Sequence, residues 1–274
     1  MQIGFMSSVS PRWDLDQLIA AARAHGYEAI EIRVEWGHAV GIELDSSREA
    51  RRDARQKLAD GGVALCCLAL GTRFARATAA ERDASVEQVA RYAELAADLG
   101  APLMRVFGGP VPEGTTVAEL RDAAAGALGR AARMAADVGV TPCLETHDDF
   151  RDPADVAYVV EMAGHHNVGI VWHATHHLRL GIPVVEGYRA LRPWIRHVHV
   201  NEGARPHDPE NTIAPAIFGE GDGNVAEVVR VLKEDDYQGV VCWEWLNGRR
   251  GEYVDPSVYL EQNAERLREY AANE

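Results

Sequence analysis

Four residues that commonly bind divalent metals stand near the downstream ends of short apolar runs: Glu145, His173, His199 and Glu244. Each run has the length and composition of a buried strand; the runs are TPCLETH (141–147), VGIVWHA (168–174), IRHVHVN (195–201) and GVVCWEW (239–245). In a parallel barrel the downstream ends of successive strands meet at one mouth, where barrel enzymes carry out their chemistry. Two carboxylates and two imidazoles gathered there would form a ligand set for one divalent ion.

Each of these residues also has a simpler explanation. Glu145 and Glu244 could be salt-bridged carboxylates at strand ends, and His199 could be a hydrogen-bonded core histidine. Two further imidazoles follow His173 closely, and the spacing alone does not decide which of the three would bind the ion. We favour a metal site with His173 as ligand and His176 lining the pocket, because the strands are otherwise apolar.

The composition limits the classes of function. The chain has 274 residues, an apolar fraction of 47% and a formal net charge of −14, which suits one large α/β domain or two small ones. Nearly all of the cations are arginines and they form no basic stripe, so nucleic acid and anionic membranes are not expected partners. The start, MQIGFMSS, is typical of a strand rather than a secretory signal, and no apolar run reaches membrane-spanning length.

The cysteines favour a reducing compartment. All four lie inside predicted strands and none belongs to a CxxC zinc pattern; they are Cys66, Cys67, Cys143 and Cys242. Cysteines placed in this way are expected to be small, buried and free of disulfides, which predicts a cytoplasmic location.

Strand-like and helix-like segments alternate along the whole chain. The predicted strands are 3–8, 29–34, 64–70, 103–109, 141–147, 168–174, 195–201 and 239–245. The predicted helices between them are 14–25, 46–60, 79–99, 117–138, 152–164, 224–235 and 256–270, with start signals at Asp14, Ser46 and Asp152-Pro153. Eight such alternations match an α/β fold of the (β/α)₈ TIM-barrel type, as a single domain over 1–274. An open doubly wound sheet would need a Gly-rich nucleotide loop, and Gly108-Gly109-Pro110 is not one.

Alternation along a strand predicts which side chains enter the barrel. Cys143 lies two positions before Glu145, and Cys242 lies two positions before Glu244, so each pair shares a face of its strand. If these faces point inward, the small cysteines fill a lower layer and the carboxylates emerge at the mouth.

Further residues could bind the substrate. Arg33, Arg73 and Arg105 stand at the ends of strands two, three and four, where a guanidinium could bind a phosphate or carboxylate through two hydrogen bonds. His197 shares a face with the metal-binding histidine of its strand and is expected to line the pocket. The long Gly- and Pro-rich segment 203–223 is expected to lie over the mouth as a lid.

These residues, in this order, resemble the xylose-isomerase-like TIM-barrel superfamily of sugar isomerases and epimerases, and the resemblance covers essentially the whole chain. In that family the ligands are a Glu ending strand five, an Asp ending strand six, a His of an HxH on strand seven and a Glu ending strand eight. Glu145, His199 (in His197-Val198-His199) and Glu244 match three of the four. The Asp-x-x-His of the family corresponds to His173-Ala174-Thr175-His176, which implies that His176 contacts a substrate oxygen.

Other segments carry the same resemblance. Arg205 matches an arginine of the ketose epimerases six residues after the metal-binding histidine, which implies that it binds substrate. Gly219-Glu220-Gly221-Asp222-Gly223 resembles the turn before the last helix of the barrel, and Leu103 to Gly109, with Arg105, resembles the strand-four segment.

The chain departs from the family pattern at two positions. His173 replaces an anionic ligand with a neutral one, which should favour Zn²⁺, Co²⁺ or Mn²⁺ over Mg²⁺. Arg151 stands where ketose 3-epimerases have a second Glu, six positions after the strand-five Glu. In addition, Glu145-Thr146-His147 resembles the ExH of 3-dehydroshikimate dehydratases, which implies a role for His147 as a base.

The expected activity is a metal-dependent isomerisation or epimerisation of a small sugar or related polyhydroxy carbonyl compound. One divalent ion would stabilise the enediolate that forms when Glu145 or Glu244 removes a proton next to the carbonyl. A dehydratase of the inosose or 3-dehydroshikimate type, with His147 or His176 carrying the proton, is the second hypothesis. A metal-free barrel that only binds a sugar is the third. The expected partner is a small sugar-like molecule, and a homo-oligomer remains open.

Overall fold

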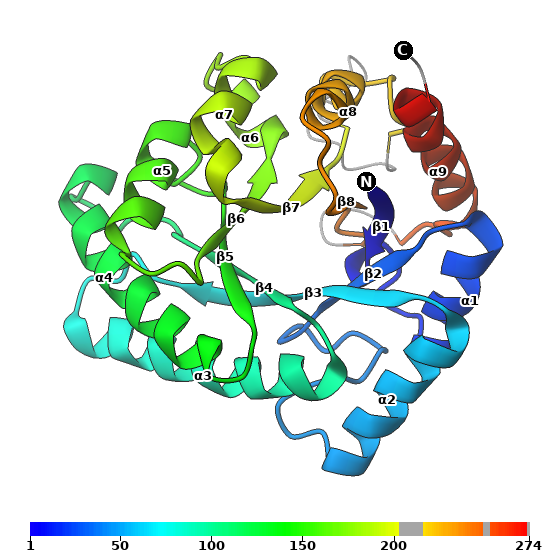
Figure 1. Cartoon of the computed structure of the whole chain (residues 1–274), viewed down its shortest axis with the longest axis horizontal. Coiled ribbons are helices and arrows are strands. Elements are labelled where there is room, and N and C mark those ends of the chain that lie inside the picture. Colours follow the sequence, from blue (N-terminus) through cyan, green and yellow to red (C-terminus); the bar gives the residue numbers. More distant parts are fainter. Residues whose placement is uncertain (203–215, 249–252, 273–274) are drawn as a thin grey trace.

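A computed structural model describes residues 1–202, 216–248 and 253–272, and in them eight parallel strands close into a barrel. Each strand pairs with the next along the chain, and β1 pairs with β8 to complete the ring (Figure 1). The strands are β1 (Gln2–Met6), β2 (Ala29–Arg33), β3 (Ala64–Arg73), β4 (Leu103–Phe107), β5 (Thr141–Glu145), β6 (Gly169–His173), β7 (Ile195–Val200) and β8 (Val240–Trp243). The predicted TIM barrel is confirmed.

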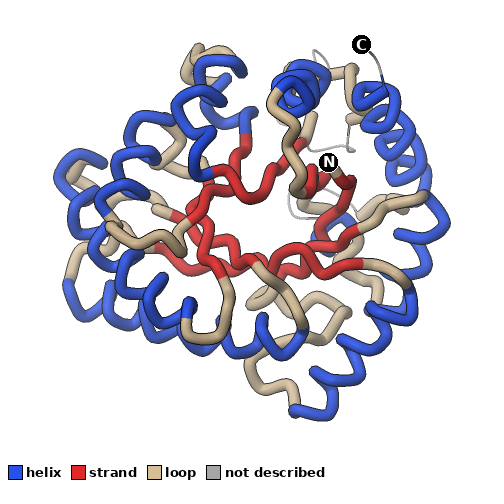
Figure 2. The backbone as a smooth tube through the Cα atoms, viewed as in Figure 1, coloured by secondary structure: helices blue, strands red, loops and turns tan. Residues whose placement is uncertain are grey.

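Helices surround the barrel (Figure 2). They are α1 (Leu15–His25), α2 (Arg48–Gly61), α3 (Ala79–Leu99), α4 (Val117–Ala136), α5 (Pro153–Met162), α6 (Ala174–Leu178), α7 (Val184–Leu191), α8 (Val225–Glu234) and α9 (Ser257–Ala272), with 3₁₀ turns at Ser7–Val9 and Arg192–Trp194. In the described part of the chain, none of these helices has the length and apolar character needed to cross a bilayer.

Local start signals explain where several helices begin. The Asp14 side chain accepts a hydrogen bond from the Gln17 backbone N–H at the start of α1, and Asp152 caps α5 with Pro153 in its first turn, as predicted. The prediction for α2 was wrong by one residue, because Ser47 caps that helix rather than Ser46. Ser46 instead accepts a hydrogen bond from the Glu43 backbone N–H.

Two helices between β6 and β7 were not predicted. The helix α6 has only five residues and α7 has eight, with Gly181 and Pro183 between them, so neither provides a long periodic pattern. The first begins immediately after His173, which is its N-cap residue. It therefore carries His176 and His177 directly beside the end of β6.

Small side chains fill the lower interior of the barrel, while the larger apolar core lies between strands and helices. The interior cluster consists of Met6, Ala29, Cys66, Cys67, Ala69, Val240 and Cys242, all buried. All four cysteines are buried and free, as predicted. Trp172 and Trp243 alternate with the inward-facing residues and belong to the outer core.

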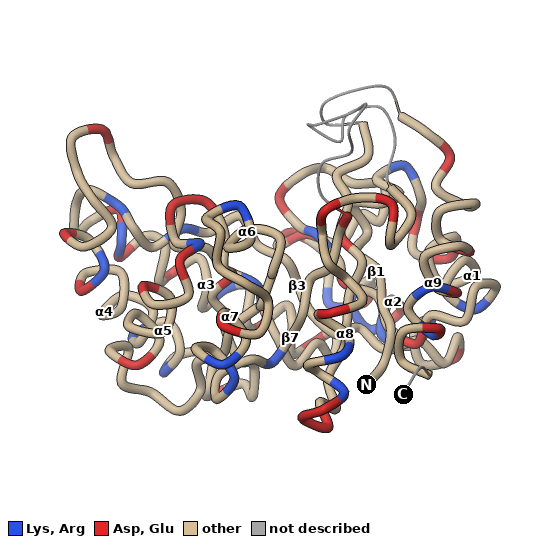
Figure 3. The backbone as a smooth tube through the Cα atoms, turned by 90° about the horizontal axis from the view of Figure 1, so that it is seen from above, with Lys and Arg blue, Asp and Glu red and all other residues tan. Residues whose placement is uncertain are grey.

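Charged residues of both signs are interspersed along the described elements (Figure 3). In this view the Lys and Arg positions are spread over the described elements and do not gather into one stripe. The sequence has 28 basic and 42 acidic residues.

Candidate metal centre

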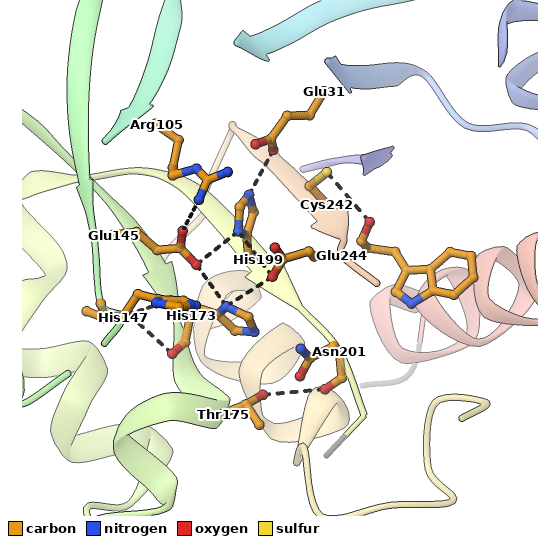
Figure 4. Close-up of polar contacts among 12 residues, drawn as sticks. Glu31, Arg105, Glu145, His147, His173, Thr175, His199, Asn201, Cys242 and Glu244 are labelled. Carbon is orange, nitrogen blue, oxygen red and sulfur yellow. Dashed lines mark hydrogen bonds and ion pairs between the residues drawn. The ribbon is translucent and has the colours of Figure 1, made fainter. Parts of the chain in front are cut away.

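The four predicted ligands meet at the carboxyl end of the barrel. Glu145 and His173 are the last residues of β5 and β6, His199 is the penultimate residue of β7, and Glu244 directly follows β8. Their side chains point toward one another (Figure 4). The first three are fully buried and Glu244 is 8% exposed.

The spacing of their donor atoms fits a single ion. Glu145 Oε1 lies 3.0 Å from His173 Nδ1 and 3.4 Å from His199 Nδ1. Glu244 Oε2 lies 3.5 Å from His173 Nδ1 and 3.9 Å from His199 Nδ1. Ligands about 2.1 Å from a tetrahedral ion are separated from each other by about 3.4 Å, close to these values. The donor set, two carboxylates and two imidazoles, suits a transition ion such as Zn²⁺ or Mn²⁺.

A second group of ligand-type residues lies deeper in the barrel and behaves differently. Glu31 Oε2 lies 2.7 Å from His197 Nε2 and 2.8 Å from His199 Nε2. These distances are those of N–H···O hydrogen bonds and are shorter than the spacing of two ligands on one ion. Burial would raise the pKa of Glu31, but the two imidazoles outweigh it and hold this pKa far below its usual range. Glu31 is therefore an anionic acceptor.

Glu31 consequently determines how His199 presents its ring. When Nε2–H donates to Glu31, the lone pair of Nδ1 is left to face Glu145 and Glu244. Glu31 was not predicted as a site residue. The signal was available, because Glu31 is a carboxylate inside the apolar run AIEIRV at an inward position of the alternation.

Two neighbours hold Glu145 and His173 in place. Arg105 Nη1 donates to Glu145 Oε2 at 3.2 Å, and both side chains are almost fully buried. Burial raises the pKa of Glu145, but His199, His173 and Arg105 together lower it well below its usual range. The Thr146 hydroxyl accepts from the His173 backbone N–H at 2.8 Å and contacts the His173 carbonyl at 3.2 Å, which ties the end of β5 to β6.

A third group forms the rim beside Glu145. His147 Nδ1 lies 2.9 Å from Asp148 Oδ1. The His147 ring is 4.4 Å from the His176 ring, which is 4.3 Å from the His173 ring. Burial alone would lower the pKa of His147, but the charges of Asp148 and Glu145 outweigh burial and raise this pKa. The pKa of His176 is held well below its usual range by burial and by the neighbouring imidazoles.

The remaining predicted residues lie in different places. His197 is fully buried one layer below His199, where it donates to Glu31 and does not reach the mouth. Arg105 contacts Glu145 directly. Arg205 and most of the predicted lid, 203–223, lie outside the described residues. His177 accepts from Trp172 Nε1 at 3.1 Å and so takes no part in the cluster of donors.

Solved structures with the same fold include several sugar enzymes. A D-psicose 3-epimerase determined in the presence of D-fructose is 18% identical, with a TM-score of 0.81 and 100% coverage of both chains. The probable 3-DHS dehydratase AsbF of petrobactin synthesis from Bacillus anthracis is 17% identical, with a TM-score of 0.80 and coverage of 98% of this chain and 99% of that one. The 3-keto-D-glucoside 4-epimerase YcjR from E. coli is 18% identical, with a TM-score of 0.76 and coverage of 98% of each chain. At these identities the likeness establishes the fold.

Two sequence comparisons add to these structural ones. An uncharacterized protein of Methanocaldococcus jannaschii is 29% identical over 177 residues, which span 61% of this chain and 59% of that protein's length. The family model described as xylose isomerase-like TIM barrel matches residues 19–270. The chain therefore belongs to the xylose isomerase-like TIM-barrel family.

Proposed function

We propose that this protein is a divalent-metal-dependent isomerase or epimerase of a small sugar or related polyhydroxy carbonyl compound. The observation that carries the proposal is the set of four donors from β5 to β8, spaced for one ion at the mouth of the barrel. Two of the similar structures, a D-psicose 3-epimerase and a 3-keto-D-glucoside 4-epimerase, support the same class of substrate.

Glu145, His173, His199 and Glu244 would hold the ion. A bound divalent ion would polarise a substrate carbonyl and acidify the neighbouring C–H bond. The two carboxylates then differ in what they can do. Arg105 engages Glu145 in a buried salt bridge, whereas the Glu244 side chain is 11% exposed at the edge of the mouth. We assign proton removal to Glu244 and the holding of the ion mainly to Glu145.

His147 would carry the second proton. His147 Nδ1 faces Asp148 Oδ1 at 2.9 Å, which leaves Nε2 to receive or return a proton. The His147–Asp148 pair would take over the role of the second Glu of ketose 3-epimerases, whose position is occupied by Arg151 in this chain. Proton return to the opposite face of the same carbon would epimerise, and return to the adjacent carbon would isomerise.

A dehydratase is the second candidate. The same proton removal, followed by loss of a β-hydroxyl protonated by His147, would expel water. The observation that favours it is the His147–Asp148 contact at 2.9 Å in the segment Glu145-Thr146-His147. The likeness to a probable 3-DHS dehydratase adds support for this second reaction.

Solvent exchange tests both reactions together. We would incubate the metal-loaded protein in D₂O with ketoses, inososes and 3-dehydroshikimate, and follow the carbon-bound protons by NMR. Deuterium next to the carbonyl with a new sugar is the expected result, and a dehydrated product would select the second candidate. Absence of exchange across the panel, in protein that contains metal, would contradict proton removal as the chemistry.

Replacement of the carboxylates separates their roles. Glu244→Gln should lower turnover by about 10²–10⁴-fold, the usual loss when a general base is removed, while the protein stays folded. Glu145→Gln should reduce metal content more than Glu244→Gln does. Glu161→Gln, on the exposed face of α5, is the matched control. Normal turnover of Glu244→Gln would remove it from the mechanism, and metal-free parent protein would favour a sugar-binding barrel.

A further inference from the structure

A carboxylate just beyond β7 is bound by the backbone of a glycine-rich turn. Glu202 lies two residues after the end of β7 and is 3% exposed. Its Oε1 accepts from the Gly219 backbone N–H at 2.7 Å, and its Oε2 accepts from the Gly223 backbone N–H at 3.0 Å. The Gly221 backbone N–H also bonds to this carboxylate. We call residues 219–223 the glycine turn.

Glycines allow this turn to wrap around a single side chain. Gly219 has a φ of +98°, in the left-handed region that favours glycine. A side chain added at Gly223 would lie 2.2 Å from the Asn201 carbonyl oxygen, so the turn approaches the end of β7 backbone to backbone. Successive N–H groups directed at one point form an anion-binding nest. In this chain the nest holds the chain's own carboxylate.

Both oxygens of Glu202 are needed for this arrangement. Burial raises the pKa of Glu202, while the hydrogen bonds from the Gly219, Gly223 and Gly221 N–H groups lower it. Hydrogen bonds from N–H groups to an ionised carboxylate are about twice as strong as neutral ones. A glutamine would present one oxygen and one NH₂ group, and so would accept at only one end of the turn. The carboxylate is therefore a clamp with two separate attachment points.

The clamped turn continues directly into a residue that packs on β8. Phe218 precedes Gly219 and is 1% exposed, and its ring centre lies 6.4 Å from that of Trp243 in an edge-to-face arrangement. The Phe218 backbone N–H donates to Asn263 Oδ1 of α9 at 2.9 Å. Trp243 is the last residue of β8, and Glu244 follows it. Phe218 thus connects the clamp to the strand end that carries Glu244.

The direction of the Glu244 side chain depends on how Trp243 is seated. The strand β8 has four residues, fewer than any other described strand, and Glu244 lies just outside it. The Glu244 backbone N–H donates to the Val200 carbonyl at 3.0 Å. Successive side chains of an extended chain point to opposite faces, so Trp243 packs outward while Glu244 points into the mouth. A displaced Trp243 ring would therefore turn Glu244 away from its position.

We propose that Glu202 is a positioning residue for Glu244. Its carboxylate fixes the glycine turn, the turn seats Phe218 against Trp243, and Trp243 sets the direction of the Glu244 side chain. This role requires no contact of Glu202 with the ion or with the substrate. The inference rests on the proposed function only for the role of Glu244 as the base.

Chemical rescue tests the clamp without a substrate. Glu202→Ala removes the carboxylate, and formate is small enough to take its place. The Gly219 and Gly223 amide protons should exchange with solvent about tenfold or more faster in Glu202→Ala than in the parent. Formate should restore slow exchange, and chloride should not. Parent-like exchange in Glu202→Ala would overturn the clamp.

Two further variants sharpen this measurement. Glu202→Gln keeps the volume of the side chain and should expose only one of the two amide protons, because it accepts at one end. Asp222→Asn makes the same chemical change at an exposed position of the same turn and should keep the parent rates. Protection of both amides in Glu202→Gln would also overturn the clamp.

Fluorine NMR tests whether the clamp reaches β8. The protein would be labelled with 5-fluorotryptophan, and the Trp243 signal among the six tryptophans would be assigned with Trp243→Phe. This signal should shift in Glu202→Ala and return with formate. It should also shift in Phe218→Leu, in which the Gly219 and Gly223 amides stay protected. A Trp243 signal unaffected by the loss of Glu202 would confine the clamp to the turn and overturn the proposal.

Kinetics test the effect on Glu244. With a substrate that shows solvent exchange, Glu202→Gln should lower kcat by about 10–100-fold, as expected when a reacting group is misplaced. KM and metal content should remain unchanged. Formate should restore kcat in Glu202→Ala. A parent-like kcat together with a shifted Trp243 signal would overturn the positioning role, whereas a parent protein without exchange activity would contradict the proposed function and leave the clamp to the two NMR measurements.

Discussion

At the scale of single residues, His199 serves two partners through its two ring nitrogens. Nε2 donates to Glu31 at 2.8 Å, and Nδ1 faces Glu145 and Glu244. A carboxylate behind a metal-binding histidine fixes its tautomer and increases its basicity. Glu31 would thus influence an ion bound by His199 without touching it.

Substitution of Glu31 should therefore weaken metal binding. Glu31→Gln removes the anionic acceptor and should reduce affinity for Zn²⁺ or Mn²⁺ by about 10–100-fold. Competition with a chelating dye measures the affinity, and nitrogen NMR of the imidazoles reports the tautomer of His199. Glu265→Gln on the exposed face of α9 is the control, and Glu31→Asp should retain part of the effect. If Glu31→Gln binds metal as tightly as the parent, the assignment is wrong.

A second expectation concerns His173, a neutral imidazole where the family has an Asp. His173→Asp would add a negative charge and a hard oxygen donor, so the metal preference should shift from Zn²⁺ toward Mn²⁺ and Mg²⁺. Metal analysis after equilibration with an equimolar mixture of the three ions measures this preference. Unchanged content and selectivity would exclude His173 and make His176 the candidate ligand.

The sequence predicted the residues that end strands better than the residues that support them. Glu145, His173, His199 and Glu244 interrupt apolar runs, so their chemistry is visible in one dimension. Their supporting partners come from distant segments: Glu31 is 168 positions from His199. Such a contact depends on the closure and register of the barrel, which spacing along the chain does not contain.

At the scale of elements, close packing restricts individual glycines. A side chain added at Gly129, in α4, would lie 2.2 Å from the Ala163 carbonyl at the end of α5, whereas one added at Gly126 would meet nothing within 4 Å. The two positions lie on the same helix and differ only in what they face. They therefore make a matched pair.

Alanine at these two positions should change stability in opposite directions. Gly129→Ala should destabilise the protein by about 1–3 kcal/mol through overpacking against α5. Gly126→Ala should stabilise it by about 0.5–1 kcal/mol, because glycine costs backbone entropy inside a helix. Thermal or urea unfolding of both variants measures the difference. Similar behaviour of the two would show that α5 moves aside easily.

The helices were predictable where the periodic pattern of apolar residues was long. The helix α3 has 21 residues and coincides with its prediction, 79–99. The helices α6 and α7 were missed because each is short and their stability comes from packing on β6 and β7 rather than from periodicity. The missed prediction of α6 affects the site, since α6 carries His176.

At the scale of the whole molecule, the four proposed metal ligands come from the ends of four consecutive strands, half of the closed ring. An ion bound by all four should oppose opening of the barrel. At a free metal concentration of 100 times Kd, stabilisation should be about 2.7 kcal/mol. Differential scanning calorimetry with Zn²⁺ or Mn²⁺, and after chelation, measures it. Glu145→Gln should lose most of the shift, and an equal shift in that variant would place the ion elsewhere.

The buried cysteines give the barrel an internal reporter of its own opening. All four thiols of the chain are buried on β3, β5 and β8, and burial raises the pKa of Cys143 to about 12. A thiol of this kind reacts with alkylating reagents only after it meets solvent and can lose its proton. The rate of alkylation would then follow how often the strands separate, without a probe introduced from outside.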